Sequence, residues 1–83
     1  MGDVIVVFKI MPEKPEDFEN IKKELEKLKP QRLEEEPIAF GLKALKFTTI
    51  IPDAEGEIEK LENRLDSVEN VQSVECITVS RSL

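Results

Sequence analysis

The chain repeats one pattern of apolar residues after forty positions, and this repeat limits its possible folds more than any other feature. Residue identity between the halves is low, so the repeat shows one supersecondary unit used twice and does not require gene duplication. The matched positions are Ile5 with Leu45, Val7 with Phe47, Ile10 with Ile50, Met11 with Ile51, Pro12 with Pro52, Phe18 with Ile58, Ile21 with Leu61, Leu25 with Leu65, and Leu28 with Val68.

The first copy predicts a strand followed by a helix. Residues 4–10 are almost continuously apolar, which is typical of a central strand, and Pro12 is expected to end it because proline cannot continue a ladder. A helix is expected to open at Pro15, Glu16 and Asp17 and to stop at Pro30. Its apolar residues recur at steps of three and four, which places them on one face: Phe18, Ile21, Leu25 and Leu28.

The second copy predicts a strand over residues 42–51, a turn at Pro52 and Asp53, and a second amphipathic helix. Residues 71–80 form the last expected strand. Between the copies, the charged segment 31–36 is expected to be an edge strand, where charge discourages unwanted pairing.

The predicted order is therefore βαββαβ, an α+β, ferredoxin-like split βαβ fold. Both helices are expected on one face of a four-stranded antiparallel sheet. Right-handed crossovers place the first and third strands at the centre. The other face is expected to expose residues such as Lys46 and Thr48.

Composition narrows the function. With 83 residues, positions 1–83 are expected to form one small domain. The net charge of −6, with Lys and Arg interleaved with Glu, argues against direct nucleic-acid binding and favours a basic protein surface as partner. No apolar run is long enough to span a membrane, and we expect no signal peptide. The single Cys76 fits a reducing compartment, so a cytoplasmic location is expected.

The sequence lacks the residue types and motifs on which most catalytic sites depend. The chain has no His and one Cys, so an imidazole base and a zinc site built of His and Cys are excluded. Phosphate-loop and nucleophile-elbow motifs are also missing, and the Glu residues lie at helical spacing on solvated faces. We therefore expect no intrinsic enzymatic activity and assign no cofactor or metal to the chain.

The segment Pro37, Ile38, Ala39, Phe40 and Gly41 is the strongest candidate site. Pro stiffens the chain and Gly permits unusual backbone angles, so these residues mark a turn between two strands. A rigidly presented Phe40 would suit an anchor in a partner's pocket, since aromatic anchors dominate many interfaces. Alternatively, Phe40 folds back onto the chain's own core.

The segment 35–45 closely resembles the hairpin of the archaeal elongation factor 1-beta family. Further similarity lies in residues 1–7 with Met11 and Pro12, residues 52–56, residues 68–75 and residues 79–83. The resemblance implies a factor that promotes GDP release from elongation factor 1-alpha, the GTPase that delivers aminoacyl-tRNA. It also implies that Phe40 enters a pocket of that GTPase.

The same resemblance implies a second contact near the C-terminus. A basic residue there disturbs the magnesium and phosphate site of the bound nucleotide, and the magnesium belongs to the GTPase. In eukaryotic relatives this residue is a penultimate Lys. Here Ser82 is penultimate, and aligning residues 71–73 places Arg81 opposite that Lys, although a planar guanidinium is no simple substitute for an ammonium group.

Three functions remain distinguishable. A nucleotide exchange factor predicts that Phe40 is exposed in the free protein. A small-ligand-binding regulatory module on the same fold predicts a ligand pocket and a packed Phe40. An acylphosphatase-like phosphohydrolase would need an Arg in a phosphate-cradling loop, whereas residues 12–17 offer only Lys14, so it ranks last.

Overall fold

Four strands and two α-helices alternate along the chain in the order expected from the repeat. The computed structural model describes residues 2–81, so the expectations that involve Met1, Ser82 and Leu83 lie outside the described residues. The elements are β1 (Asp3–Pro12), a short 3₁₀ helix η1 (Pro15–Asp17), α1 (Phe18–Glu26), β2 (Arg32–Pro37), β3 (Lys43–Pro52), α2 (Glu57–Asp66) and β4 (Val71–Ser80).

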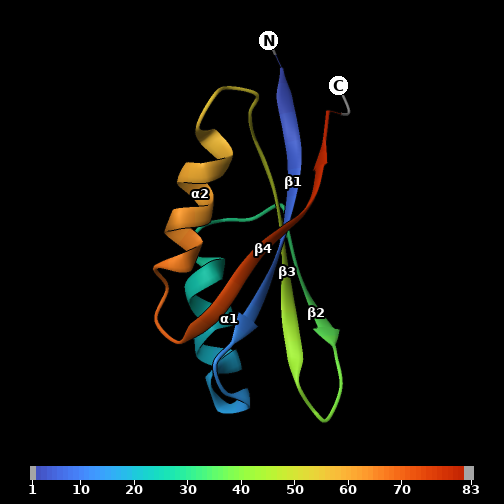
Figure 1. The fold of residues 1–83 in the computed structure, drawn as a ribbon, viewed down its shortest axis with the longest axis vertical. Helices are drawn as coiled ribbons and strands as arrows, with labels where there is room; N and C mark the ends of the chain where they lie inside the picture. Colours follow the sequence, from blue (N-terminus) through green and yellow to red (C-terminus); the bar gives the residue numbers. More distant parts are fainter. Residues whose placement is uncertain (1, 82–83) are drawn as a thin grey trace.

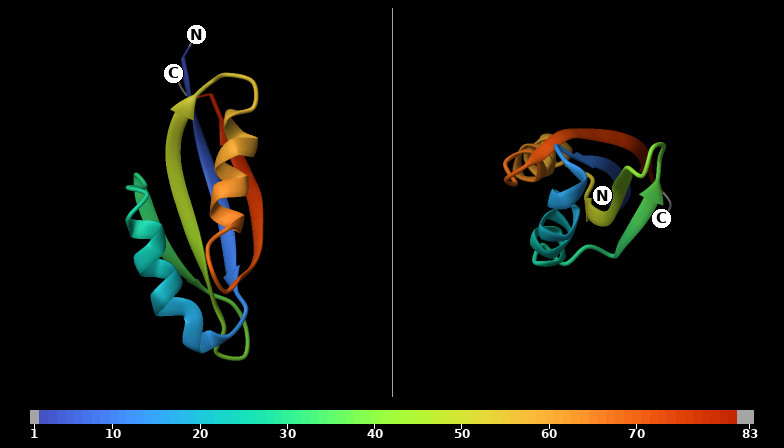
Figure 2. Two further views of the ribbon diagram at one scale, coloured as in Figure 1. Left: turned by 90° about the vertical axis from the view of Figure 1, so that its left-hand side faces the viewer. Right: turned by 90° about the horizontal axis from the view of Figure 1, so that it is seen from below.

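The strands form one antiparallel sheet in the order β2-β3-β1-β4. The first and third strands are central, as predicted. Both helices lie against the same face of the sheet, with α2 beside β4 and α1 beside the lower half of β3 (Figures 1 and 2). This is the βαββαβ arrangement of the ferredoxin-like fold.

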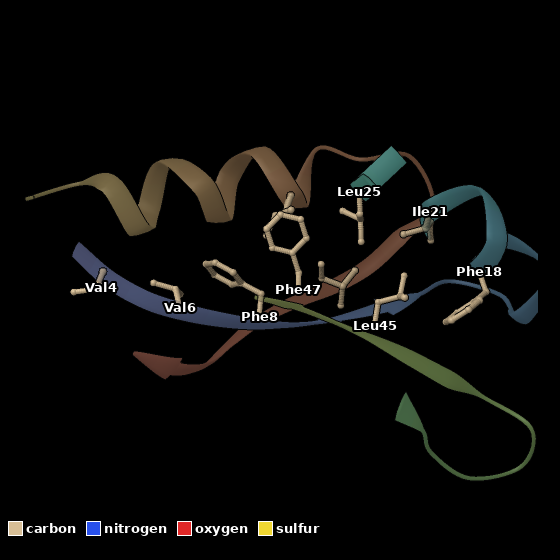
Figure 3. Close-up of a cluster of buried hydrophobic side chains, with 10 residues drawn as sticks. Val4, Val6, Phe8, Phe18, Ile21, Leu25, Leu45 and Phe47 are labelled. Atoms are coloured by element: carbon tan, nitrogen blue, oxygen red, sulfur yellow. The ribbon is translucent and has the colours of Figure 1, made fainter. Parts of the chain in front are cut away.

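The core lies between this sheet face and the helices (Figure 3). The alternate residues of β1 that face the helices pair with their counterparts on β3, for example Phe8 with Phe47 and Ile10 with Leu45. The buried residues of the cluster are Val4, Val6, Phe8, Ile10, Phe18, Ile21, Leu25, Leu45, Phe47 and Leu65. The remaining helical stripe residues, Leu28, Ile58, Leu61 and Val68, are partly buried against it, which confirms the predicted apolar faces.

The first helix is shorter than expected at both ends. Residues 15–17 form the 3₁₀ helix η1, and the α-helix begins only at Phe18. It ends at Glu26, where the N–H of Leu28 donates to the carbonyl of Leu25 in a tightened last turn. Lys29 then takes a positive φ of 55°. The helix is therefore closed by its own last turn before Pro30 is reached, and the prediction that Pro30 stops it was wrong.

Pro12 ends the first strand, as expected. It is the last residue of β1 and pairs with Val71 after a register shift that follows Met11. A proline at a strand terminus, beside an irregularity, costs the ladder little because no further hydrogen bond is required there. The edge strand β2 covers Arg32–Pro37, which is one residue later than its expected range of 31–36.

The sheet face away from the helices carries a row of charges across all four strands. The register places Glu34 beside Lys46, Lys46 beside Lys9, and Lys9 beside Glu75. The row therefore reads acid, base, base, acid, and an acid flanks each lysine. Lys9 also lies 3.9 Å from Glu36, which further offsets the repulsion between the two adjacent lysines.

Candidate functional site

The candidate hairpin is a tight turn between β2 and β3. The N–H of Ile38 donates to the carbonyl of Leu42 at 2.8 Å, and the N–H of Leu42 donates to the carbonyl of Ala39 at 3.0 Å. The second bond closes the four-residue turn from Ala39 to Leu42. Because Pro37 pairs with Lys43 at the foot of the loop, the ladder runs up to the turn and holds it firmly.

Two residues of this turn have left-handed backbone angles. Phe40 has a φ of 57° and Gly41 a φ of 77°, the signs found at the centre of a type I′ turn. Glycine adopts such angles at no steric cost, which explains Gly41. An L-residue with a side chain costs about 1–2 kcal/mol there, and Asn or Asp would be the usual occupant. Phe40 is therefore a strained choice.

Phe40 is also fully exposed. Its side chain is 100% accessible, and the neighbouring Ile38 is 43% accessible. An unburied aromatic ring and an unfavourable backbone angle thus coincide at one position. Neither contributes to the stability of the free protein, and backbone strain of this kind concentrates at functional sites. The alternative in which Phe40 packs onto the chain's own core was wrong.

Ionic and aromatic contacts tie the base of the hairpin to α1. Lys43 Nζ lies 5.3 Å from the centre of the Phe18 ring and 3.5 Å from Glu35 Oε1. Glu35 Oε2 accepts a hydrogen bond from Lys22 Nζ at 2.9 Å. Glu35 therefore bridges β3 and α1, and the turn is oriented by contacts outside its own ladder.

The hydrogen bond from Lys22 lowers the pKa of Glu35 below its ordinary value of 4.5, and the same bond to Glu35 raises the pKa of Lys22. A carboxyl group with a lowered pKa stabilises the fold above its unfolded-state pKa, and this contribution is lost as the pH falls through the folded-state value. Both side chains are well solvated, so the effect is small and screened by salt.

We therefore expect acidification below about pH 4.5 to reduce the stability of the wild type more than that of Glu35→Gln. Urea titrations of both proteins at a series of pH values, at low ionic strength, measure this difference. Glu34→Gln is the matched control, because Glu34 lies on the opposite sheet face, beside Lys46. Identical acid profiles for wild type and Glu35→Gln would contradict the bridge.

A shallow depression lies beside the turn, under Gly41 and Lys43. Pro15, Phe18 and Glu19 form its other walls, and its volume is about 130 Å³. The hairpin end of the molecule therefore combines a projecting ring with an adjacent hollow partly lined by an aromatic side chain. A projecting side chain beside a hollow is typical of a surface that packs against another protein.

Arg81 lies just beyond β4 and is paired within the chain. Its Nε donates to Asp53 Oδ2 at 2.9 Å, and its Nη2 donates to Asp53 Oδ1 at 3.4 Å. Asp53 belongs to the connection between β3 and α2. The hairpin and the end of β4 lie at opposite ends of the sheet (Figure 1), and the longest extent of the molecule is 42 Å. The structure thus does not bring Phe40 and Arg81 together.

Sequence analysis did not predict three contacts around the candidate residues. These are the pairs Arg81 with Asp53, Lys22 with Glu35, and Lys43 with the ring of Phe18. Within residues 2–81, no group of three or more Asp, Glu or Cys is arranged to hold a metal ion. In the same part of the chain, no helix has the length and apolar character needed to cross a membrane.

Comparison with known proteins matches nearly the whole chain to one family. The EF-1 guanine nucleotide exchange domain matches residues 5–81. Elongation factor 1-beta of Methanoregula boonei is 45% identical over 83 residues, which cover 96% of this chain and 98% of the relative. The protein of that name from Methanothermobacter thermautotrophicus is 42% identical, with 98% of each chain covered. That from Methanobrevibacter smithii is 44% identical, with 100% and 99% covered.

Proposed function

The chain belongs to the EF-1 guanine nucleotide exchange domain family, and on that premise we propose that it drives GDP release from elongation factor 1-alpha through two separate contacts. Phe40 is the first contact and enters a pocket of the GTPase. Arg81 is the second and brings positive charge to the magnesium and phosphate site. The observation that carries the proposal is the exposed ring of Phe40 on a strained backbone.

Exchange requires that the factor bind more tightly to the GTPase state that holds nucleotide weakly. A thousandfold acceleration of release corresponds to about 4 kcal/mol of barrier lowering. Burial of one Phe side chain contributes about 1.5–3 kcal/mol, and part of that is needed for binding itself. A second contact that acts on the nucleotide site supplies the difference.

The shape of the molecule supports a partner of several domains. The two contacts lie at opposite ends of a sheet whose three longest strands run ten residues, or roughly 33 Å. A small ligand could not reach both ends. The chain contributes binding and charge without bond-making chemistry of its own, and magnesium belongs to the nucleotide site of the partner. Because elongation takes place in the cytoplasm, we infer that the protein acts there.

We expect Arg81→Ala to lower the maximal rate of fluorescent GDP release from elongation factor 1-alpha by about ten- to a hundredfold, because a charge-assisted contact contributes roughly 1.5–3 kcal/mol. Stopped-flow release assays at several factor concentrations separate the maximal rate from the half-saturating concentration. Arg64→Ala, which removes a guanidinium from α2, is the matched control. Equal maximal rates for Arg81→Ala and wild type would remove the second contact.

The small-ligand-binding module is the second candidate and belongs to a different class. It predicts saturable binding of a metabolite, whereas the depression beside the hairpin is shallow and Phe40 lies outside it.

If a folded wild-type protein fails to accelerate GDP release from its cognate GTPase, the exchange proposal is overturned for that pair.

A further inference from the structure

We propose that Asp53 is a positioning residue that holds the Arg81 guanidinium in the orientation from which it meets the GTPase. The inference rests on the proposed function, because it names the residue that orients Arg81 for the second contact with the GTPase. The ion pair joins residues 28 positions apart in the sequence. Among the described residues, no other side-chain hydrogen bond or ion pair joins the end of β4 to the connection before α2.

Asp53 is itself fixed to the corner of the sheet. Its N–H donates to the carbonyl of Gly2 at 2.9 Å, and the next N–H, of Ala54, donates to the carbonyl of Pro52 at 2.9 Å. The preceding Pro52 pairs with Asp3 at the start of β1. The carboxylate therefore projects from an anchored backbone, whereas Arg81 follows the last residue of its strand and its side chain is 76% exposed.

The geometry of the pair leaves the guanidinium able to bind a second group. Asp53 accepts from Nε and Nη2, which form one edge of the guanidinium plane. Of the five N–H groups of an arginine, two on Nη1 and one on Nη2 remain. Arg81 can thus donate to an anionic oxygen of the partner without leaving Asp53, and the pair restricts a side chain that otherwise has many rotamers.

The neighbourhood favours an anion carried by the partner over a free one. Arg81 and Asp53 border an open depression of about 700 Å³ that is also lined by Glu55, Glu59 and Glu62. A free phosphate approaching this surface meets several carboxylates, which repel it. An oxygen anion fixed on the GTPase is brought to Arg81 by the rest of the interface, whose energy offsets this repulsion.

The test measures GDP release with Asp53→Ala, Asp53→Glu and Asp53→Ala combined with Arg81→Ala. We expect Asp53→Ala to lower the maximal rate by about two- to fivefold, the range of an exposed ion pair, at an unchanged half-saturating concentration. Asp53→Glu should restore part of the rate. The double variant should equal Arg81→Ala, because Asp53 acts only through Arg81. Glu55→Ala, an acid of the same depression outside the pair, is the matched control.

A second readout does not involve the GTPase. In ¹⁵N-labelled free protein, the Nε–H signal of Arg81 should exchange slowly with water and lose this protection in Asp53→Ala. Retained protection in that variant, a raised maximal rate, or losses that add in the double variant would each overturn the positioning role. If Arg81→Ala lowers the rate and Asp53→Ala does not, only this inference fails. If Arg81→Ala matches wild type, the second contact and its positioning fail together.

Discussion

Phe40→Ala is expected to raise the half-saturating concentration of this protein in GDP release by about ten- to a hundredfold. The lost burial of the ring is worth about 1.5–3 kcal/mol, and each 1.4 kcal/mol is a factor of ten in affinity. In the free protein the ring is fully accessible, so its removal uncovers no cavity. Titration of the factor against a fixed amount of GDP-loaded elongation factor 1-alpha measures the shift.

Phe40→Asn separates the ring from the turn that presents it. Asparagine accepts the positive φ of this position more readily, so the free energy of unfolding of Phe40→Asn should equal that of the wild type or exceed it by up to about 1 kcal/mol. Its half-saturating concentration in GDP release should rise as that of Phe40→Ala does. Ile77→Ala, at an exposed apolar residue in β4, is the control. Wild-type affinity in both Phe40 variants would contradict the anchor.

Phe47→Ala is expected to lower the free energy of unfolding by about 3–5 kcal/mol. The Phe47 ring is 1% exposed, lies opposite Phe8 in the register and points towards the helices (Figure 3). A domain of this size has a total stability of about 4–12 kcal/mol, so the loss removes a large part of it and would unfold a protein at the lower end of that range.

Urea unfolding followed by circular dichroism measures this loss, and Phe40→Ala is the matched control because it removes the same atoms from an exposed site. A loss below about 1 kcal/mol in Phe47→Ala would mean that the ring does not support the core as the structure indicates. If the variant does not fold, the milder Phe47→Leu should retain the fold and lose about half as much.

The repeat was sufficient to predict the order of helices and strands, and right-handed crossovers then gave the order of strands in the sheet. It did not predict the faces of the first strand. The repeat matches Val7 with Phe47, whereas the structure buries Phe8 opposite Phe47, because a shift of one residue moves a side chain to the other face. Helix boundaries were less predictable. The end of α1 depends on a tightened turn and on the positive φ of Lys29. The sequence there permits several backbone conformations, so it does not predict this one.

The site was predictable only in part, for a similar reason. Pro37 and Gly41 marked the turn, but the left-handed angle at Phe40 is a property of the closed hairpin and has no residue signature of its own. Asp53 looked like an ordinary turn residue, since the Arg81 that gives it a partner is 28 positions away. The alternation in β2 did place Glu35 on the helix side, and a search for lysines on the facing helix could have found Lys22.

The row of charges on the uncovered sheet face affects how copies of this protein meet. A second copy stacked face to face in register about a two-fold axis would place lysine opposite lysine and glutamate opposite glutamate. Like charges held opposite one another repel, so the pattern disfavours this stacking although the row itself carries no net charge. The symmetry of the acid–base–base–acid order, and not an excess of one charge, is therefore what opposes this pairing of two copies.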